Sequence, residues 1–179
     1  LFNFVNFLGC LIIIFSKEII SLFVSEDYYD SHVVIPFIVT SCIFRGAQIV
    51  VDTTLYAQDK TIYHPLIVGT GLVVNIIGNI VLLPLIGMVG AAISSLISFW
   101  VLYMLSVYIT KKFININWMS IWISNYILVT CLLSTLLSYF YYNNMILSFI
   151  IKILGFLILG IITHLLFNKV NDISNLKKS

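Results

Sequence analysis

The chain has 179 residues, of which 61% are apolar and only 9% are Asp, Glu, Lys or Arg, whereas a soluble domain carries about 25% charged residues. Its mean hydropathy of +1.11 and the uncharged runs 61–110 and 113–151 exclude a soluble globular domain, a disordered chain and a coiled coil, because a transmembrane helix needs about 20 apolar residues. A net charge of +2, scattered along the chain, does not suit nucleic acid, so the composition predicts an all-α polytopic membrane protein in contact with membrane lipid.

Six transmembrane helices are predicted from the apolar segments, and they form one lobe over residues 1–168, followed by a basic tail at 169–179. Acidic residues follow the first helix, a short uncharged turn joins the third to the fourth, and Tyr-Tyr-Asn-Asn separates the last two. The three prolines fall at helix ends, where a missing N–H costs little. The predicted helices lie at about 1–23, 33–57, 65–84, 88–110, 118–140 and 145–167.

The lysines of the loops and the tail indicate the orientation, because Lys and Arg are retained on the cytoplasmic side. Only Lys17 lies on the side of the acidic segment. The lysines on the side of the tail are Lys60, Lys111, Lys112, Lys169, Lys177 and Lys178. We therefore expect a multi-pass protein of the cytoplasmic membrane, with its C-terminus in the cytoplasm and its acidic segment outside.

The chain begins at Leu1 inside an apolar stretch, without the basic start or small-residue cleavage site of a signal peptide, so we expect it to be the C-terminal piece of a longer protein. Cys10, Cys42 and Cys131 lie far apart in apolar segments and are predicted to be packing residues rather than a disulfide framework or a metal cluster. The sequence contains no protease, hydrolase or nucleotide-binding motif. No catalytic residue, cofactor or metal is therefore expected.

Small and polar residues recur every four positions on the third and fourth predicted helices. In lipid, helices associate through small residues that allow close approach, so these two faces are predicted to pack together while bulkier residues such as Leu102 lie elsewhere. Packing is favoured over ligand binding here, with Asn75 and Asn79 as secondary substrate-binding candidates. The two faces consist of Gly71, Asn75, Gly78 and Asn79, and of Gly90, Ala91, Ser94, Ser95 and Ser98.

A polar stripe runs down the second predicted helix, which is otherwise made of Ile, Val, Phe and Leu. Its members are separated by three or four residues and share one face: Ser41, Arg45, Gln48, Asp52 and Tyr56. A guanidinium group halfway along a span costs at least about 2.5 kcal/mol to insert, so Arg45 needs a partner or water. Either Arg45 reaches toward Asp52 in an internal ion pair with Gln48 between them, or these three residues line an aqueous path and bind a phosphate or another anion.

Lys152 lies about two turns into the last predicted helix, with Ser148 and Gly155 on its face. It is close enough to the outer surface for its ammonium group to snorkel, and a substrate-binding role in a cavity is the alternative. The three histidines lie near helix ends and are predicted to be interfacial rather than catalytic: His32, His64 and His164.

The order of residues in the third and fourth helices resembles that of a known family. The run from Asn75 to Ser95, N-I-I-G-N-I-V-L-L-P-L-I-G-M-V-G-A-A-I-S-S, resembles the helix–turn–helix of polysaccharide and O-antigen flippases in the multidrug/oligosaccharidyl-lipid/polysaccharide exporter superfamily. Glu18–Tyr28 and Leu55–Thr61 resemble the segments that precede it in that family. The likeness in layout covers essentially the whole chain.

The resemblance implies a two-lobed, all-helical transporter in which this chain is most of the C-terminal lobe and its partner is a missing N-terminal lobe. Such proteins move undecaprenyl-diphosphate-linked oligosaccharides to the outer leaflet of the bacterial cytoplasmic membrane by alternating access, for surface polysaccharide synthesis. Arg45 matches the cavity arginines that meet the diphosphate. Two alternatives remain open. A multidrug exporter of the same superfamily would be expected to bind cations through carboxylates near the midplane, whereas Asp52, the only acid of the second predicted helix, lies nearer the cytoplasmic end and so favours an anionic substrate. The other alternative is a non-transporting scaffold subunit of a synthase.

Overall fold

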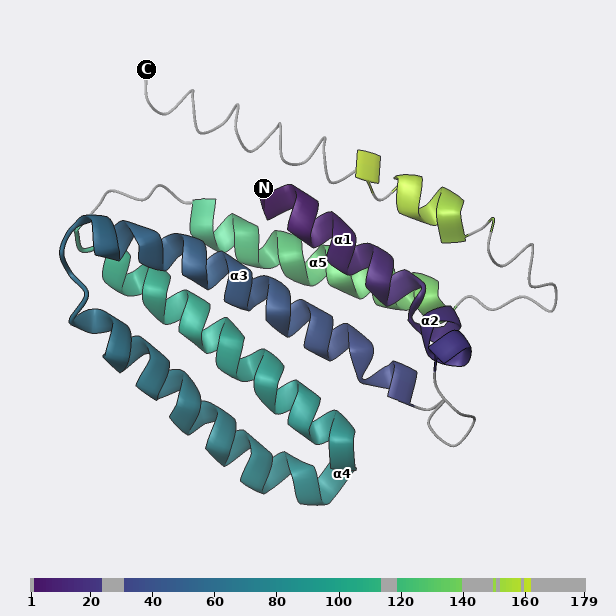
Figure 1. The fold of residues 1–179 in the computed structure, drawn as a ribbon, viewed down its shortest axis with the longest axis horizontal. Helices are drawn as coiled ribbons and strands as arrows, with labels where there is room; N and C mark the ends of the chain where they lie inside the picture. The colour runs from purple at the N-terminus through teal and green to yellow at the C-terminus, as the bar shows by residue number, and fades with distance from the viewer. Residues whose placement is uncertain are drawn as a thin grey trace. The chain divides into compact units, whose positions relative to one another are not determined.

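The computed structural model describes residues 2–23, 31–113, 119–139, 150, 152–158 and 160–161, and these form helices and short turns. The helices are α1 (Phe2–Ile14), α2 (Ser16–Phe23), α3 (Ile35–Ala57), α4 (Tyr63–Thr110) and α5 (Met119–Tyr139) (Figure 1). The stretches 31–57 and 63–110 are long and apolar enough to cross a membrane, and the bent pair α1 and α2 adds a third if it is one span. The described chain is all-helical, as predicted, with the character of a membrane protein.

The chain divides into two compact units. One unit spans Val33–Ile116 and contains α3 and α4, and the other contains α1, α2, α5 and the described residues between 150 and 161. The acidic segment, the predicted turn after Tyr139, His164 and the basic tail lie outside the described residues.

α3 begins and ends close to its predicted bounds of 33 and 57. Pro36 occupies the first turn of the helix, where the backbone N–H that proline lacks would have no intrahelical partner. After Ala57 the chain turns back, because the N–H groups of Gln58 and Lys60 both donate to the carbonyl oxygen of Leu55, at 3.2 and 3.0 Å. This tight connection brings α4 alongside the end of α3.

α4 is interrupted near its middle and folds back on itself as two antiparallel arms (Figure 1). Ile86 and Gly87 leave the helical conformation, and Gly87 has φ 58° and ψ −139°, a combination that is open essentially only to glycine. Pro84 removes a helical N–H just before the break. The helices predicted at 65–84 and 88–110 are therefore both present, as the two arms.

The two arms pack through the predicted small faces. The Ser94 hydroxyl donates to the carbonyl oxygen of Asn75 at 2.9 Å, and a Cβ atom added to Gly78 would collide with the Ser94 side chain. Leu102 is 4% exposed and lies against Gly71. The prediction that Leu102 lies away from this face was wrong, because the four-residue series of the second arm continues through Ser98 to Leu102 and all of it is buried.

A large side chain at Gly78 is expected to force the arms apart. Gly78→Leu overfills a closed contact, which costs about 1–3 kcal/mol, and should lower the yield of folded protein extracted from membranes. Gly69→Leu is the matched control on the same arm, because nothing lies within 4 Å of a Cβ atom placed there. Equal yields of the two variants, measured by fluorescence size-exclusion chromatography, would contradict the packing of the arms.

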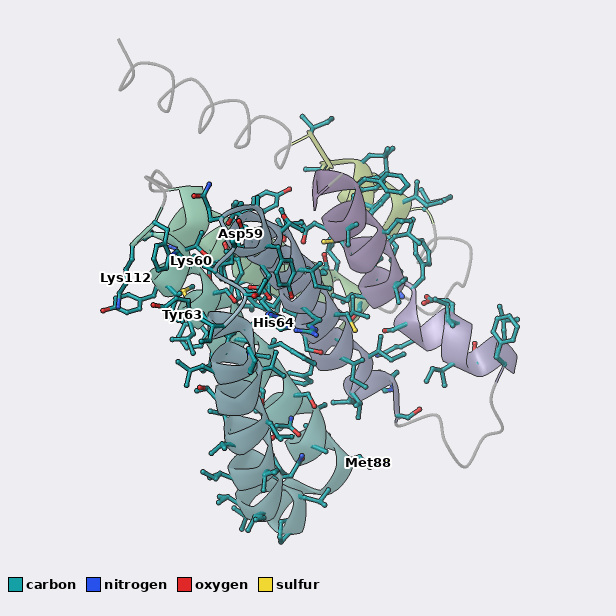
Figure 2. The ribbon with its side chains drawn as sticks, turned by 60° about the vertical axis from the view of Figure 1, so that its left-hand side comes forward. Asp59, Lys60, Tyr63, His64, Met88 and Lys112 are labelled. Carbon is teal, nitrogen blue, oxygen red and sulfur yellow. The ribbon has the colours of Figure 1, made fainter. Side chains whose placement is uncertain are left out.

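α3 packs against the second arm of α4, and the two ends of this unit differ in chemistry. The rings of Phe44 and Tyr103 lie 5.9 Å apart between the two helices. Figure 2 places Lys60 and Lys112 at one end of the unit and the exposed Met88 at the other. The lysine end and the apolar bend are thus separated by the length of the hairpin arms.

In the other unit, α1 and α2 are bent by 63° at Phe15, so the prediction of one continuous helix over residues 1–23 was wrong. The shorter helix α2 buries Ser16 and Ile20, which lie four residues apart on one face. α1 packs on α5, where the Asn6 side-chain amide donates to Thr130 Oγ1 at 3.2 Å. The Cys10 thiol interacts there with Cys131.

Candidate functional site

Three members of the polar stripe predicted on α3, Ser41, Gln48 and Asp52, are buried, whereas Tyr56 at its end is exposed. Gln48 is 0% exposed and Asp52 is 2% exposed, while Arg45 is half-buried. Ser41 is buried too, but its hydroxyl donates to the Ile38 carbonyl oxygen at 2.7 Å within the helix. The members of the stripe that bear functional chemistry are therefore Arg45, Gln48 and Asp52.

These three side chains form a continuous hydrogen-bonded chain. Arg45 Nη1 donates to Gln48 Oε1, and Gln48 Nε2 donates to Asp52 Oδ2 at 2.5 Å. The spacing of three and then four residues makes this possible, because residues at these separations are neighbours on a helix surface. The glutamine amide thus links Arg45 to Asp52, and among the described residues the two charged groups form no direct ion pair with each other.

His64 of α4 lies beside the Asp52 end of this chain. Its Nδ1 lies 3.2 Å from Asp52 Oδ2, and its ring centroid lies 5.4 Å from that of Tyr56. Sequence reasoning placed His64 at an interface and did not associate it with the stripe. The signal that was missed is the short connection after α3, which returns the first turn of α4 to the last turns of α3.

The Arg45 guanidinium group lies 5.9 Å from the centre of the Phe99 ring on α4, a distance typical of a cation–π contact. A guanidinium group has five N–H donors. Among the described residues, Gln48 is the one acceptor that its hydrogen bonds reach. Arg45 therefore keeps donors for a ligand while its charge is partly withdrawn from solvent.

Asn75 and Asn79 lie in the contact between the arms of α4. The Asn75 amide reaches Ser95 Oγ at 3.5 Å, and the Asn79 amide donates to Asn75 Oδ1 at 2.9 Å. In the described part of the chain, neither asparagine hydrogen-bonds to the α3 stripe. Their geometry is that of interhelical hydrogen bonding, and a substrate-binding role for them stays a prediction.

Lys152 belongs to the other unit. Its side chain is 0% exposed, and Nζ lies 2.5 Å from Glu18 Oε1 on α2. The expectation that its ammonium group snorkels to the surface was wrong, because a carboxylate inside the unit satisfies the charge locally. A substrate-binding role for Lys152 stays a prediction.

Metal binding has no geometric support in the described residues, which contain no cluster of three or more His, Cys, Asp or Glu side chains that could hold an ion. Comparisons with protein-family models, curated proteins and solved structures find no match. The chemistry of the α3 stripe itself must therefore indicate the function. A half-buried guanidinium group linked to a buried acid can bind an anion and can respond to a change of charge on that acid.

Proposed function

We propose that this chain is a lobe of a transporter that moves a lipid-linked oligosaccharide of the undecaprenyl-diphosphate type across the bacterial cytoplasmic membrane by alternating access. The observation that carries the proposal is the half-buried Arg45 guanidinium group, which is held by Gln48 midway along an apolar helix. The resemblance of the run from Asn75 to Ser95 to lipid-linked oligosaccharide flippases supports the same class.

A diphosphate suits Arg45 for electrostatic and geometric reasons. The planar fork of a guanidinium group matches paired phosphate oxygens, and the attraction between opposite charges grows as the effective dielectric constant falls. Gln48 fixes one N–H group and leaves others for the ligand. Asp52, linked through Gln48, offsets the cost of keeping Arg45 charged when no substrate is bound.

The transporter lobe is proposed to have six spans, with the lysine end of the α3–α4 unit in the cytoplasm. The bent pair α1 and α2, α3, the two arms of α4 and α5 would supply five spans, and the apolar segment 145–167 the sixth. This assignment is supported by Lys60 and Lys112, which share one end of their unit (Figure 2).

The topology is tested with single cysteines in a cysteine-free variant. Cysteines placed near Lys111 and near Asn143 are expected to react with a membrane-impermeant maleimide from opposite sides, because an odd number of spans separates the two positions. Intact cells should label only the second position, and opened cells should label both. Labelling of both positions in intact cells would contradict the six-span topology.

Anion binding is tested directly on the full chain in lipid nanodiscs. A fluorescent prenyl diphosphate is expected to bind, and Arg45→Ala should weaken binding by at least about tenfold, in line with the loss of a desolvated charge pair. Lys111→Ala, an exposed lysine at the end of α4, is the matched control for charge and should bind as the wild type does. Equal binding of the corresponding uncharged prenol would contradict recognition of the diphosphate.

A structural role in a non-transporting scaffold subunit is the second candidate. It is favoured by the hydrogen bonds from Arg45 to Gln48 and from Gln48 to Asp52, which link the two charged groups within one helix. In that case Arg45 and Asp52 contribute to folding, and the removal of both charges together should leave the stability of the protein nearly unchanged. The double variant described in the Discussion separates the two functions.

A further inference from the structure

Two lysines from different parts of the chain meet at the end of the α3–α4 unit that lies away from the bend of α4 (Figure 2). The Lys60 ammonium group lies 5.5 Å from the centre of the Phe113 ring, and that of Lys112 lies 4.9 Å from the centre of the Tyr108 ring. Both distances are typical of cation–π contacts. Because Phe113 directly follows Lys112 in the chain, its contact with Lys60 brings the two lysines together.

The backbone and the core hold both lysines in place. The N–H group of Lys60, after α3, donates to the carbonyl oxygen of Leu55 at 3.0 Å. The N–H group of Lys112, after α4, donates to the carbonyl oxygen of Ile109 at 3.1 Å. The Phe113 side chain packs against the buried cluster that contains both Leu55 and Ile109. The fold therefore fixes the backbone of both lysines before any ligand binds.

The charges of these two ammonium groups are not neutralised within the described chain. Neither Lys60 nor Lys112 belongs to an ion pair among the described residues. Asp59, the acid next to Lys60 in the sequence, is exposed and forms no ion pair there either. An ammonium group has three N–H donors, and an aromatic ring faces only one side of it. Both lysines therefore keep donors and charge for an anion.

Exposed apolar side chains lie close to the lysines along the chain. Ile62, just before α4, is 80% exposed, Leu66 in the first turns of α4 is 61% exposed, and Tyr108 is 62% exposed. In a chain that crosses a membrane, acyl chains cover such apolar side chains, and tyrosines mark the boundary with the head groups. A ligand that satisfies the lysines and these side chains together has an anionic head and an apolar tail.

We propose that Lys60 and Lys112 bind the phosphate group of an anionic phospholipid, whose acyl chains cover the exposed apolar side chains beside them. Basic residues that cluster at the end of transmembrane helices attract anionic head groups. A phosphate held by both lysines would also tie the connection after α3 to the end of α4. This inference goes beyond the proposed function, because it requires a membrane surface at the lysine end and no transported substrate.

Native mass spectrometry of the full chain, released from detergent micelles, tests this site with dioleoyl phosphatidylglycerol as the probe. The wild type is expected to bind this lipid at least about fivefold more tightly than phosphatidylcholine with the same acyl chains. Lys60→Ala and Lys112→Ala should each weaken phosphatidylglycerol binding about fivefold, the effect of one lysine at an anionic membrane surface. Equal affinity of the wild type for the two lipids would overturn the site.

Two further variants distinguish this site from a general attraction between basic residues and anionic lipid. Lys111→Ala removes a neighbouring exposed lysine that contacts no aromatic ring in the described chain, and should change the affinity by less than about twofold. Tyr108→Leu keeps every charge but removes the ring beside Lys112, and should weaken binding about twofold to threefold. An equal loss in Lys111→Ala and Lys112→Ala, or no loss in Tyr108→Leu, would overturn the site.

Soluble glycerol phosphate, added in large excess, distinguishes a lipid from a free phosphate compound. It should leave phosphatidylglycerol bound, because it lacks the acyl chains that cover Ile62 and Leu66. Displacement of the lipid by glycerol phosphate would overturn the phospholipid as the ligand. Failure of the fluorescent prenyl diphosphate to bind would overturn the proposed function, whereas the phosphatidylglycerol measurements would still decide whether the lysines bind a phospholipid.

Discussion

Arg45→Ala in the intact transporter is expected to abolish translocation of the lipid-linked oligosaccharide while the protein stays in the membrane. A desolvated guanidinium group attracts phosphate far more strongly than a hydrated one does, and removal of one partner of a buried charge pair costs about 2–5 kcal/mol. Arg45→Lys should keep part of the activity, because it retains the charge and loses the fork. The measurement is the amount of surface polysaccharide in cells whose only copy of the gene is on a plasmid. An immunoblot of the membrane fraction measures the amount of protein in the same cells.

The double variant Arg45→Ala with Asp52→Ala distinguishes substrate binding from internal pairing. If Arg45 only neutralises Asp52 through Gln48, removing both charges should restore the activity that either single change removes. If Arg45 binds the substrate, the double variant should stay inactive. Recovery of surface polysaccharide in the double variant would therefore contradict substrate binding by Arg45 and favour the structural role.

Lys152→Met is expected to destabilise its unit by about 3–5 kcal/mol, the cost of leaving a buried charge without its partner. Lys152 is fully buried, and the second carboxylate oxygen of Glu18 is buried without a hydrogen-bond partner among the described residues. The loss of the ammonium group would therefore leave both Glu18 oxygens unsatisfied. The measurement is the thermal unfolding midpoint of the purified chain in detergent.

Two companion variants test the physical cause of this loss. Lys152→Met with Glu18→Gln removes both charges and should recover most of the stability, since replacing a buried ion pair as a whole is often neutral. Lys111→Met changes an exposed lysine at the end of α4 and should leave the midpoint nearly unchanged. A double variant as unstable as Lys152→Met would show that lost packing, rather than the unpaired carboxylate, is the cause.

Residue spacing on a single helix predicted much of the candidate site. Arg45, Gln48 and Asp52 were placed on one face from their separations, and the structure links them by hydrogen bonds. His64 was missed, because its contact depends on how the chain turns back after α3. Helical periodicity specifies which residues share a face and does not specify which element approaches that face.

The same distinction applies to the fold. The bounds of α3 and the break in α4 followed from apolar length, proline and glycine, because these residues act on the backbone where they stand. The burial of Leu102 against Gly71 and the pairing of Lys152 with Glu18 were not predicted. The first contact joins residues that are 31 positions apart in the chain, and the second joins residues that are 134 positions apart.

The sequence by itself indicated a helical membrane protein with one polar stripe on an apolar helix, because hydropathy and helical spacing are local properties that a lipid solvent enforces. The tertiary structure decided which partner each polar group has. Asp52 meets His64, and Lys152 meets Glu18, because buried charges inside helical packing need a counterpart from another element. The bend at Phe15 was likewise visible only in the folded chain.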